Sequence, residues 1–361
     1  MMKYFLSAFL WTVLACSREK QPEPIPLSDR QVALHSIGNA VIIRNLLDLQ
    51  NSVNGLNEFA SSYTYDSTDT KKLHALRKEW VNTVVSWKLA SVFLEGSFSA
   101  EIKSSNLYAP ADTASIENII VSKTQPFDPG YMQSLGETST GLAAMEYLIY
   151  GISFKDTESV ISAFRGLGSR RGAYLRALCL DLKRRSDLLL YQWSMAGNGY
   201  INKFMDASGL ERKSSVGILA DNMIATISKV KDDRIGAPLG VNGIARPELV
   251  ESRYGRESIT FIQAELQSVQ QTFTGTRTVT TGVKGFYWLL DQAQAKSGNA
   301  MLSTAIKAQF DDNYSKLSQI KVTLEEAVVA DSEQVEELYE SVSKLQKLLQ
   351  DDMVASLHFH E

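Results

Sequence analysis

Residues 140–151 read TGLAAMEYLIYG, and this stretch is the most informative part of the chain. A run of apolar residues containing a single carboxylate, Glu146, lies between Gly141 and Gly151. The run has no proline, which favours a helix, and glycine is common where helices end. A carboxylate in so apolar a helix needs a partner, because burying an unpaired charge is costly. The stretch therefore predicts a short buried helix with one polar group.

Two roles are open for Glu146. It pairs structurally, either with an arginine or with backbone amides, or it contacts a ligand directly. Arg253 and Arg256, far along the chain, are the candidate arginines. Carboxylates in unusual surroundings mark functional sites often enough to keep the ligand role open.

The same stretch resembles the signature of the imelysin-like family of bacterial envelope proteins. That signature reads Gly-x-His-x-x-Glu, followed by an aromatic-aliphatic run and a closing glycine. Gly141, Glu146 and Gly151 match it, but Ala143 stands where the histidine would be. A His and a Glu three residues apart share a helix face and together could hold one metal ion. The resemblance implies an all-α fold of two helical-bundle halves, and Ala143 removes half of the implied metal or catalytic pair.

Weaker similarities extend the resemblance over most of the chain. Residues 79–80, 87–96, 116–119 and 345–357 are similar to helical segments of the family. Residues 251–254 resemble a Glu-Ser-x-aromatic element that opens the core helices of the second half, which makes Glu251 and Arg253 candidate site residues. Relatives often carry a glutamate near the end of the 87–96 helix, where Glu95 is the only carboxylate here.

Helical periodicity supports the all-α prediction. Apolar residues step by three and four along much of the chain, and such stripes are buried against other helices. We expect long helices near 28–60, 68–96, 156–195, 209–233, 257–273, 283–296, 299–321 and 332–357, and short ones near 113–121 and 139–150. Ser28 and Ser332 are expected N-caps, and Gly96, Gly151 and Gly275 are expected at helix ends. Strand signals are weak, and the alternating residues 276–281 lie in a linker-like stretch.

The chain length allows two domains. We place the boundary near residue 205, which gives an N-terminal bundle over 28–205 with the signature and a C-terminal bundle over 206–361. The proline- and glycine-rich residues 234–247 form a competing interruption, which is either a domain linker or a functional loop.

The first 27 residues read as targeting sequence. A basic residue and an apolar run in residues 1–15 are typical of a signal peptide and too short to span a bilayer. Residues 13–16 (VLAC) look like a lipoprotein box, which implies acylation of Cys16, and the proline-rich residues 16–27 then form a tether. A plain secretory signal is the alternative. We therefore expect a lipid-anchored protein of the bacterial envelope, at the outer membrane.

Composition excludes several classes of function. The net charge of −4 shows no basic excess for nucleic acid, and the basic runs 170–171 and 183–185 read as solvated helix faces. The histidines are His35, His74, His358 and His360, without an H-E-x-x-H motif. Cys179 lies on an apolar stripe and is expected to be a buried, inert thiol. A zinc peptidase needs several well-placed ligands, which the sequence does not display.

Three functions remain. The resemblance favours a non-catalytic binding protein linked to iron or metal uptake, with its ligand site between the two helical halves. Its partners would be the membrane, through Cys16, and proteins of iron uptake. The candidate cofactor is a divalent metal or iron at Glu146. The alternatives are a metallopeptidase of the imelysin type and a structural or partner-docking lipoprotein.

Overall fold

The computed structural model describes residues 28–94, 107–122, 126–151, 157–165, 168–241, 243–278 and 282–359. The predicted signal peptide, Cys16, the tether and Glu95 lie outside the described residues. The earlier helices are α1 (Asp29–Ile37), α2 (Ile43–Tyr65), α3 (Thr70–Ala90), α5 (Thr113–Val121), α6 (Pro129–Ser134), α7 (Gly141–Tyr150), α8 (Thr157–Arg165), α9 (Gly168–Trp193) and α10 (Tyr200–Asp206). The later ones are α11 (Ser215–Lys229), α12 (Ala237–Leu239), α13 (Ser258–Thr274), α14 (Phe286–Gln292), α15 (Leu302–Gln319), α16 (Leu324–Ala330), α17 (Ser332–Lys347) and α18 (Val354–Ser356).

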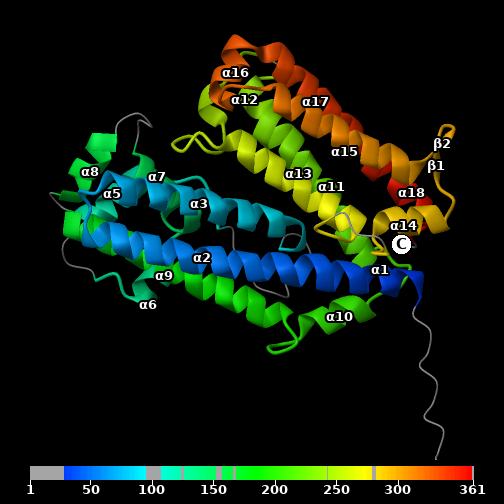
Figure 1. The fold of residues 1–361 in the computed structure, drawn as a ribbon, viewed down its shortest axis with the longest axis horizontal. Coiled ribbons are helices and arrows are strands. Elements are labelled where there is room, and N and C mark those ends of the chain that lie inside the picture. Colours follow the sequence, from blue (N-terminus) through cyan, green and yellow to red (C-terminus); the bar gives the residue numbers. More distant parts are fainter. Residues whose placement is uncertain are drawn as a thin grey trace, which may run out of the picture.

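The helices form two groups that lie against each other (Figure 1). In the first group α2, α3 and α9 run side by side, and α5 to α8 gather at one end of them. In the second group α11, α13, α15 and α17 pack together. The fold class is all-α, as predicted. The described strands are β1 (Lys296–Ser297) and β2 (Ala300–Met301), two residues each, which pair as an antiparallel hairpin. A boundary near residue 205 stays a prediction.

Helical periodicity correctly identified the core. Two of the apolar stripes that step by three and four are buried at every position: one runs from just before α2 along that helix, and the other begins in α17. These stripes are Ile42, Leu46, Leu49, Val53, Leu56 and Ala60, and Val335, Leu338, Val342, Leu345, Leu349 and Met353. Ser28 caps α1 through a capping box with Gln31, also as predicted. Cys179 is buried and free, and burial raises the pKa of its thiol.

Several predicted boundaries were wrong. The segment 156–195 forms two helices, α8 and α9, instead of one. The N-cap of α17 is Asp331, and Ser332 is already helical. The hairpin of β1 and β2 lies between α14 and α15, where two adjoining helices were predicted. Gly151 and Gly275 do end their helices with positive φ, whereas Gly96 lies outside the described residues.

Polar contacts join the two groups inside a continuous apolar core. Asn45 Nδ2 of α2 donates to Gln271 Oε1 of α13 at 3.0 Å. Asn222 Nδ2 of α11 donates to the carbonyl oxygen of Val92 at 2.8 Å. Buried amides left without such partners would be costly, so these pairs help fix how the groups dock. Within the part of the chain that the structure describes, no helix is both long and apolar enough to cross a bilayer.

Candidate functional site

The two glycines of the signature are there for steric reasons. Gly141, the first residue of α7, has a φ of +75°, and a Cβ there would overlap the carbonyl oxygen of Leu107. That carbonyl accepts the N–H of Leu142 at 2.7 Å. Gly151 ends α7 with a φ of +70°. Positive φ favours glycine, so both ends of α7 need this residue.

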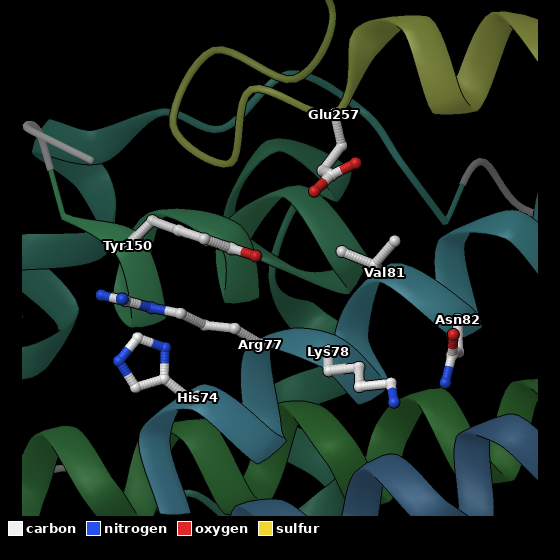
Figure 2. Close-up of a pocket in the computed structure, with 7 residues that line it drawn as sticks. All are labelled: His74, Arg77, Lys78, Val81, Asn82, Tyr150 and Glu257. Atoms are coloured by element: carbon white, nitrogen blue, oxygen red, sulfur yellow. The ribbon is translucent and has the colours of Figure 1, made fainter. Parts of the chain in front are cut away.

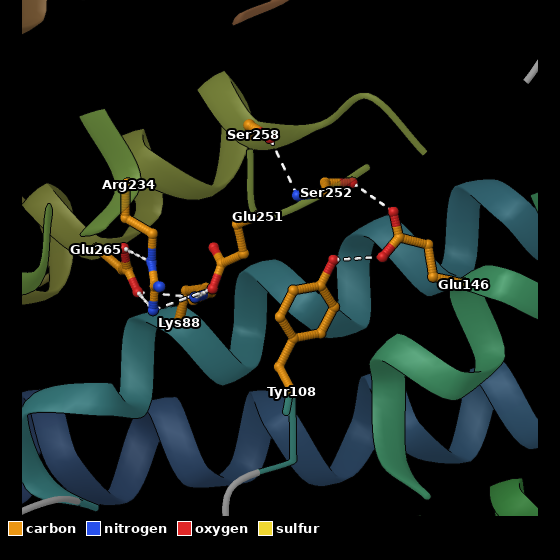
Figure 3. A network of polar contacts seen from close by, with 8 residues as sticks. All are labelled: Lys88, Tyr108, Glu146, Arg234, Glu251, Ser252, Ser258 and Glu265. Atoms are coloured by element: carbon orange, nitrogen blue, oxygen red, sulfur yellow. Dashed lines mark hydrogen bonds and ion pairs between the residues drawn. The ribbon is translucent and has the colours of Figure 1, made fainter. Parts of the chain in front are cut away.

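Glu146 is buried at the contact between the two groups of helices and accepts four hydrogen bonds. Its Oε1 accepts from Ser252 Oγ at 2.8 Å, from the N–H of Tyr254 at 3.1 Å and from the N–H of Gly255 at 2.7 Å. Its Oε2 accepts from the hydroxyl of Tyr108 at 2.6 Å (Figure 3). The carboxylate thus links α7 with the loop that precedes α13.

The partners of Glu146 are hydroxyl and amide groups. Of its candidate arginines, Arg256 forms an ion pair with Glu326 at 3.6 Å, and Arg253 is exposed. No ion pair joins Glu146 to an arginine among the described residues. Burial without a neutralising cation raises the pKa of Glu146 to about 7, although all four hydrogen bonds favour the ionised form. Its charge therefore changes near neutral pH.

A buried ion cluster lies beside this carboxylate (Figure 3). Lys88 Nζ of α3 lies 2.6 Å from Glu251 Oε1 and 2.7 Å from Glu265 Oε1 of α13. Arg234 approaches the same two carboxylates at 3.0 and 3.4 Å. The cluster holds two positive and two negative side chains, and it connects both groups of helices.

The cluster favours the ionised form of Glu265. Burial opposes the ionisation of Glu265, but the charges of Lys88 and Arg234 outweigh it and lower the pKa of this carboxyl. Burial also opposes the charge of Arg234, whereas Glu265 and Glu251 raise its pKa. Glu265 therefore differs from Glu146, which has no ion-pair partner among the described residues.

A cavity of about 580 Å³ opens between the two groups of helices at this point. The first group contributes Lys88, Ala143 and Glu146 to its wall, and the second contributes Arg234 and Glu251. Three aromatic side chains also line it: Trp87, Tyr108 and Tyr254. Ala143 lies at the cavity where the family signature has histidine, so the missing imidazole leaves space in this wall.

Some of the predicted site residues line this cavity and others do not. Ala143, Glu146, Glu251 and Arg253 line it, and Gly141 and Gly151 position the helix that carries two of them. Glu95 and Cys16 lie outside the described residues. The sequence did not single out four further residues of the site: Lys88, Tyr108, Arg234 and Glu265. Two of these had a readable signal, since Lys88 and Glu265 are charged residues within apolar helical stretches.

The donor set fits a metal ion poorly. Within the described ranges, no three or more His, Cys, Asp or Glu side chains gather closely enough to hold one. Lys88 already supplies a positive charge between Glu251 and Glu265. Carboxylates that are satisfied by an ammonium group do not need a cation from solution.

A smaller cavity of about 310 Å³ lies at the C-terminal end of α7 (Figure 2). Arg77 forms part of its wall, with Nε donating to the Ile149 carbonyl at 2.8 Å and the guanidinium 4.8 Å from the Tyr150 ring centre. His74 and Glu257 line the same cavity. Arg77 satisfies a carbonyl of the last turn of α7, which is a structural task. We therefore take the cavity beside Glu146 as the candidate site.

The fold and the site together define a class of protein. Its members are all-α and have a buried signature carboxylate and a charged cavity between two groups of helices. The protein-family model described as Imelysin matches residues 42–351 of this chain. The chain belongs to the imelysin family.

Solved structures agree with this assignment at the level of fold. The crystal structure of an imelysin-like protein from Psychrobacter arcticum 273-4 matches with a TM-score of 0.71 and 17% identity, covering 93% of this chain and 98% of that one. A "putative iron-regulated protein A precursor" from Parabacteroides distasonis ATCC 8503 matches with a TM-score of 0.74 and 15% identity, covering 93% and 97%. No curated protein matches the chain.

Proposed function

We propose that this protein is a non-catalytic binding protein of the bacterial envelope that takes a small polar ligand into the cavity between its two groups of helices. The cavity is the observation that carries the proposal, because side chains from α3, α7 and α13 converge on it with both signs of charge. Concave sites with a few convergent polar groups are the usual form of small-molecule sites.

The cavity wall keeps unused hydrogen-bonding capacity. Ser91 Oγ and Glu251 Oε2 are buried and have no hydrogen-bond partner among the described residues. Both residues line the cavity. Unsatisfied buried groups call for an explanation in a bound water or ligand. A polar ligand suits this wall better than an apolar one.

A role connected with iron is part of the proposal. The Parabacteroides neighbour is named as iron-regulated, and it shares this fold over nearly its whole length. Lipid anchoring at Cys16, expected from the lipoprotein box, would hold the body at a membrane surface. Iron bound as a chelate is the form we favour, because the donors of the cavity do not suit a bare ion.

Peptidase activity is the competing function. A hydrolytic metal site needs protein ligands and an open position on the ion. Ala143 cannot ligate a metal, and the oxygens of Glu146 already accept hydrogen bonds from Ser252 and Tyr108. These contacts favour binding over catalysis.

The test is calorimetric titration of the chain over residues 17–361 with iron(II), ferric citrate, zinc and copper. The variant Ala143→Leu narrows the cavity, and Arg253→Ala removes a charge from its wall. Arg165→Ala is the control, because Arg165 is also exposed but is not part of the cavity wall. We expect one equivalent of an iron form to bind, and both cavity variants to weaken it.

Two results would contradict the proposal. One is that no iron form binds to the wild-type chain. The other is digestion of casein by the wild-type chain but not by Glu146→Ala, which would establish the peptidase function instead.

A further inference from the structure

The outer face of α9 is apolar where a solvent-facing helix is normally polar. Among its described positions from 170 to 193, the exposed ones are Leu180, Arg184, Leu188 and Tyr191. Met195 follows just beyond the helix end, and the four apolar side chains are 40% to 63% exposed. The spacing of 4, 4 and 3 residues places the four within α9 on one narrow face of the helix, and Met195 follows that face after the helix end. Apolar residues gathered on one face, here interrupted by Arg184, mark an interaction surface more often than scattered residues do.

The same helix is basic in an acidic protein. Its charged residues are Arg170, Arg171, Arg176, Lys183, Arg184 and Arg185 against Asp181 and Asp187. Both acids form ion pairs within the helix, and Arg171 pairs with Glu117 of α5. Six basic residues thus meet three acids, which leaves an excess of positive charge. The whole chain has a net charge of −4, so this excess is local. Arg184 is exposed, as expected of a solvated face, and it lies between Leu180 and Leu188 of the apolar stripe.

We propose that the outer face of α9 rests on an anionic lipid surface. An apolar stripe bordered by basic residues is the combination that binds the interface of anionic membranes. Two copies of this chain pairing through α9 would bring two positively charged helices together, which opposes self-association through this face. Charge thus favours the lipid surface over a second copy.

The start of the folded body lies near the end of this stripe. Helix α1 packs against α10, and Trp193 at the end of α9 contacts Tyr200 and Phe204. Figure 1 shows α1, α10 and this end of α9 on the same side of the molecule. The chain from Cys16 to Ser28 can span at most about 40 Å. An anchor at Cys16 would therefore hold this end of α9 close to the membrane.

The inference uses the proposed anchor only for that distance, and its test does not need natural acylation. The chain over residues 16–361 is coupled through Cys16 to a maleimide lipid in vesicles, either of pure phosphatidylcholine or with added phosphatidylglycerol. Cys179 is 1% exposed and does not compete for coupling. Hydroxyl-radical footprinting with mass spectrometry then reports the accessibility of Tyr191 and Met195, and Tyr65, which is 92% exposed, serves as internal control.

We expect Tyr191 and Met195 to be protected from labelling on vesicles with phosphatidylglycerol, while the labelling of Tyr65 stays the same. High salt should weaken this protection. The variant Leu188→Ser/Tyr191→Ser should restore labelling of Met195, whereas Ile244→Ser/Val329→Ser should not. Ile244 and Val329 are apolar residues elsewhere that are more exposed, at 86% and 67%. The lipid surface is ruled out if both residues stay as reactive as in the uncoupled chain. Equal protection on neutral vesicles, or protection without vesicles that grows with protein concentration, also overturns the proposal. None of these results bears on ligand binding in the cavity.

Discussion

Glu146 Oε1 lies 2.7 Å from the backbone nitrogen of Gly255, so a carboxylate of the signature helix binds the loop that leads into α13. Two more donors from that loop, Ser252 Oγ and the N–H of Tyr254, share the same oxygen. Glu146 is therefore first of all a link between the two groups of helices. Its place at the cavity wall follows from that link.

Removing the carboxylate should loosen this link. We expect Glu146→Ala to lower the free energy of unfolding by about 3 kcal/mol, because buried donors of the loop and of Tyr108 lose their acceptor. At about pH 4.5, where Glu146 is neutral in the folded chain, Glu146→Gln keeps an acceptor oxygen and should cost only about 1 kcal/mol. Urea unfolding followed by circular dichroism measures both. Equal stability of Glu146→Ala and the wild type would show that the loop is held by other contacts.

The stability of the protein should depend on pH through Glu146. Its pKa is about 7 in the folded chain against an ordinary value of 4.5. Between these values the unfolded chain releases its proton first, so rising pH favours unfolding. We expect stability to fall from about pH 4.5 to about pH 7, by up to roughly 3 kcal/mol. The unfolding midpoint of the wild type should fall over this range while that of Glu146→Gln stays nearly constant, so the deficit of the variant at acidic pH should disappear and reverse as the pH rises. Parallel profiles would contradict the raised pKa.

The shared ammonium group of Lys88 should be needed for the ion cluster. Lys88→Met leaves the buried carboxylates of Glu251 and Glu265 with Arg234 as the remaining cation of the cluster, which should cost about 3–5 kcal/mol. The double variant Lys88→Met/Glu265→Gln removes one of the two charges and should recover part of that loss. Chemical unfolding of both variants measures the difference. If the double variant is no more stable than Lys88→Met, repulsion between the carboxylates is not the cause.

Restoring the missing histidine should create a metal site only when Glu146 is also released. Ala143→His adds an imidazole at the cavity, but Tyr108 still occupies Glu146 Oε2 at 2.6 Å. We expect a small gain in zinc affinity for Ala143→His and a further gain of about tenfold for Ala143→His/Tyr108→Phe. Isothermal titration calorimetry with zinc decides this. An equal affinity of the two variants would mean that the Tyr108 hydroxyl does not limit the site.

The backbone conformation of Gly141 should be irreplaceable. Gly141→Ala forces a side chain into positive φ and onto the Leu107 carbonyl, which should destabilise the protein by about 1–3 kcal/mol. Gly136→Ala is the matched control, because a Cβ there meets nothing within 4 Å and its φ is −68°. The control should change stability by less than about 0.5 kcal/mol. Thermal unfolding of the pair shows whether the signature glycine acts through its conformation.

Much of the fold was predictable because local patterns encode it. The stripes of α2 and α17 repeat every three to four residues, and one continuous apolar face can be buried in only one way. The break between α8 and α9 had a signal in Gly166 and Gly168, but the prediction gave more weight to the helical pattern and the lack of proline around them. The short hairpin of β1 and β2 was missed because four residues carry too little periodicity to read.

The sequence by itself determined the family, the all-α class and the importance of Glu146, because these depend on residue order along single helices. Only the tertiary structure decided what Glu146 binds. Its partners Tyr108, Ser252 and Gly255 lie 38 to 109 positions away, and no local pattern links such distant residues. The same holds for the ion cluster, where Lys88 meets Glu265 across 177 positions. Buried charges find partners through the docking of helices, and that docking exists only in the folded chain.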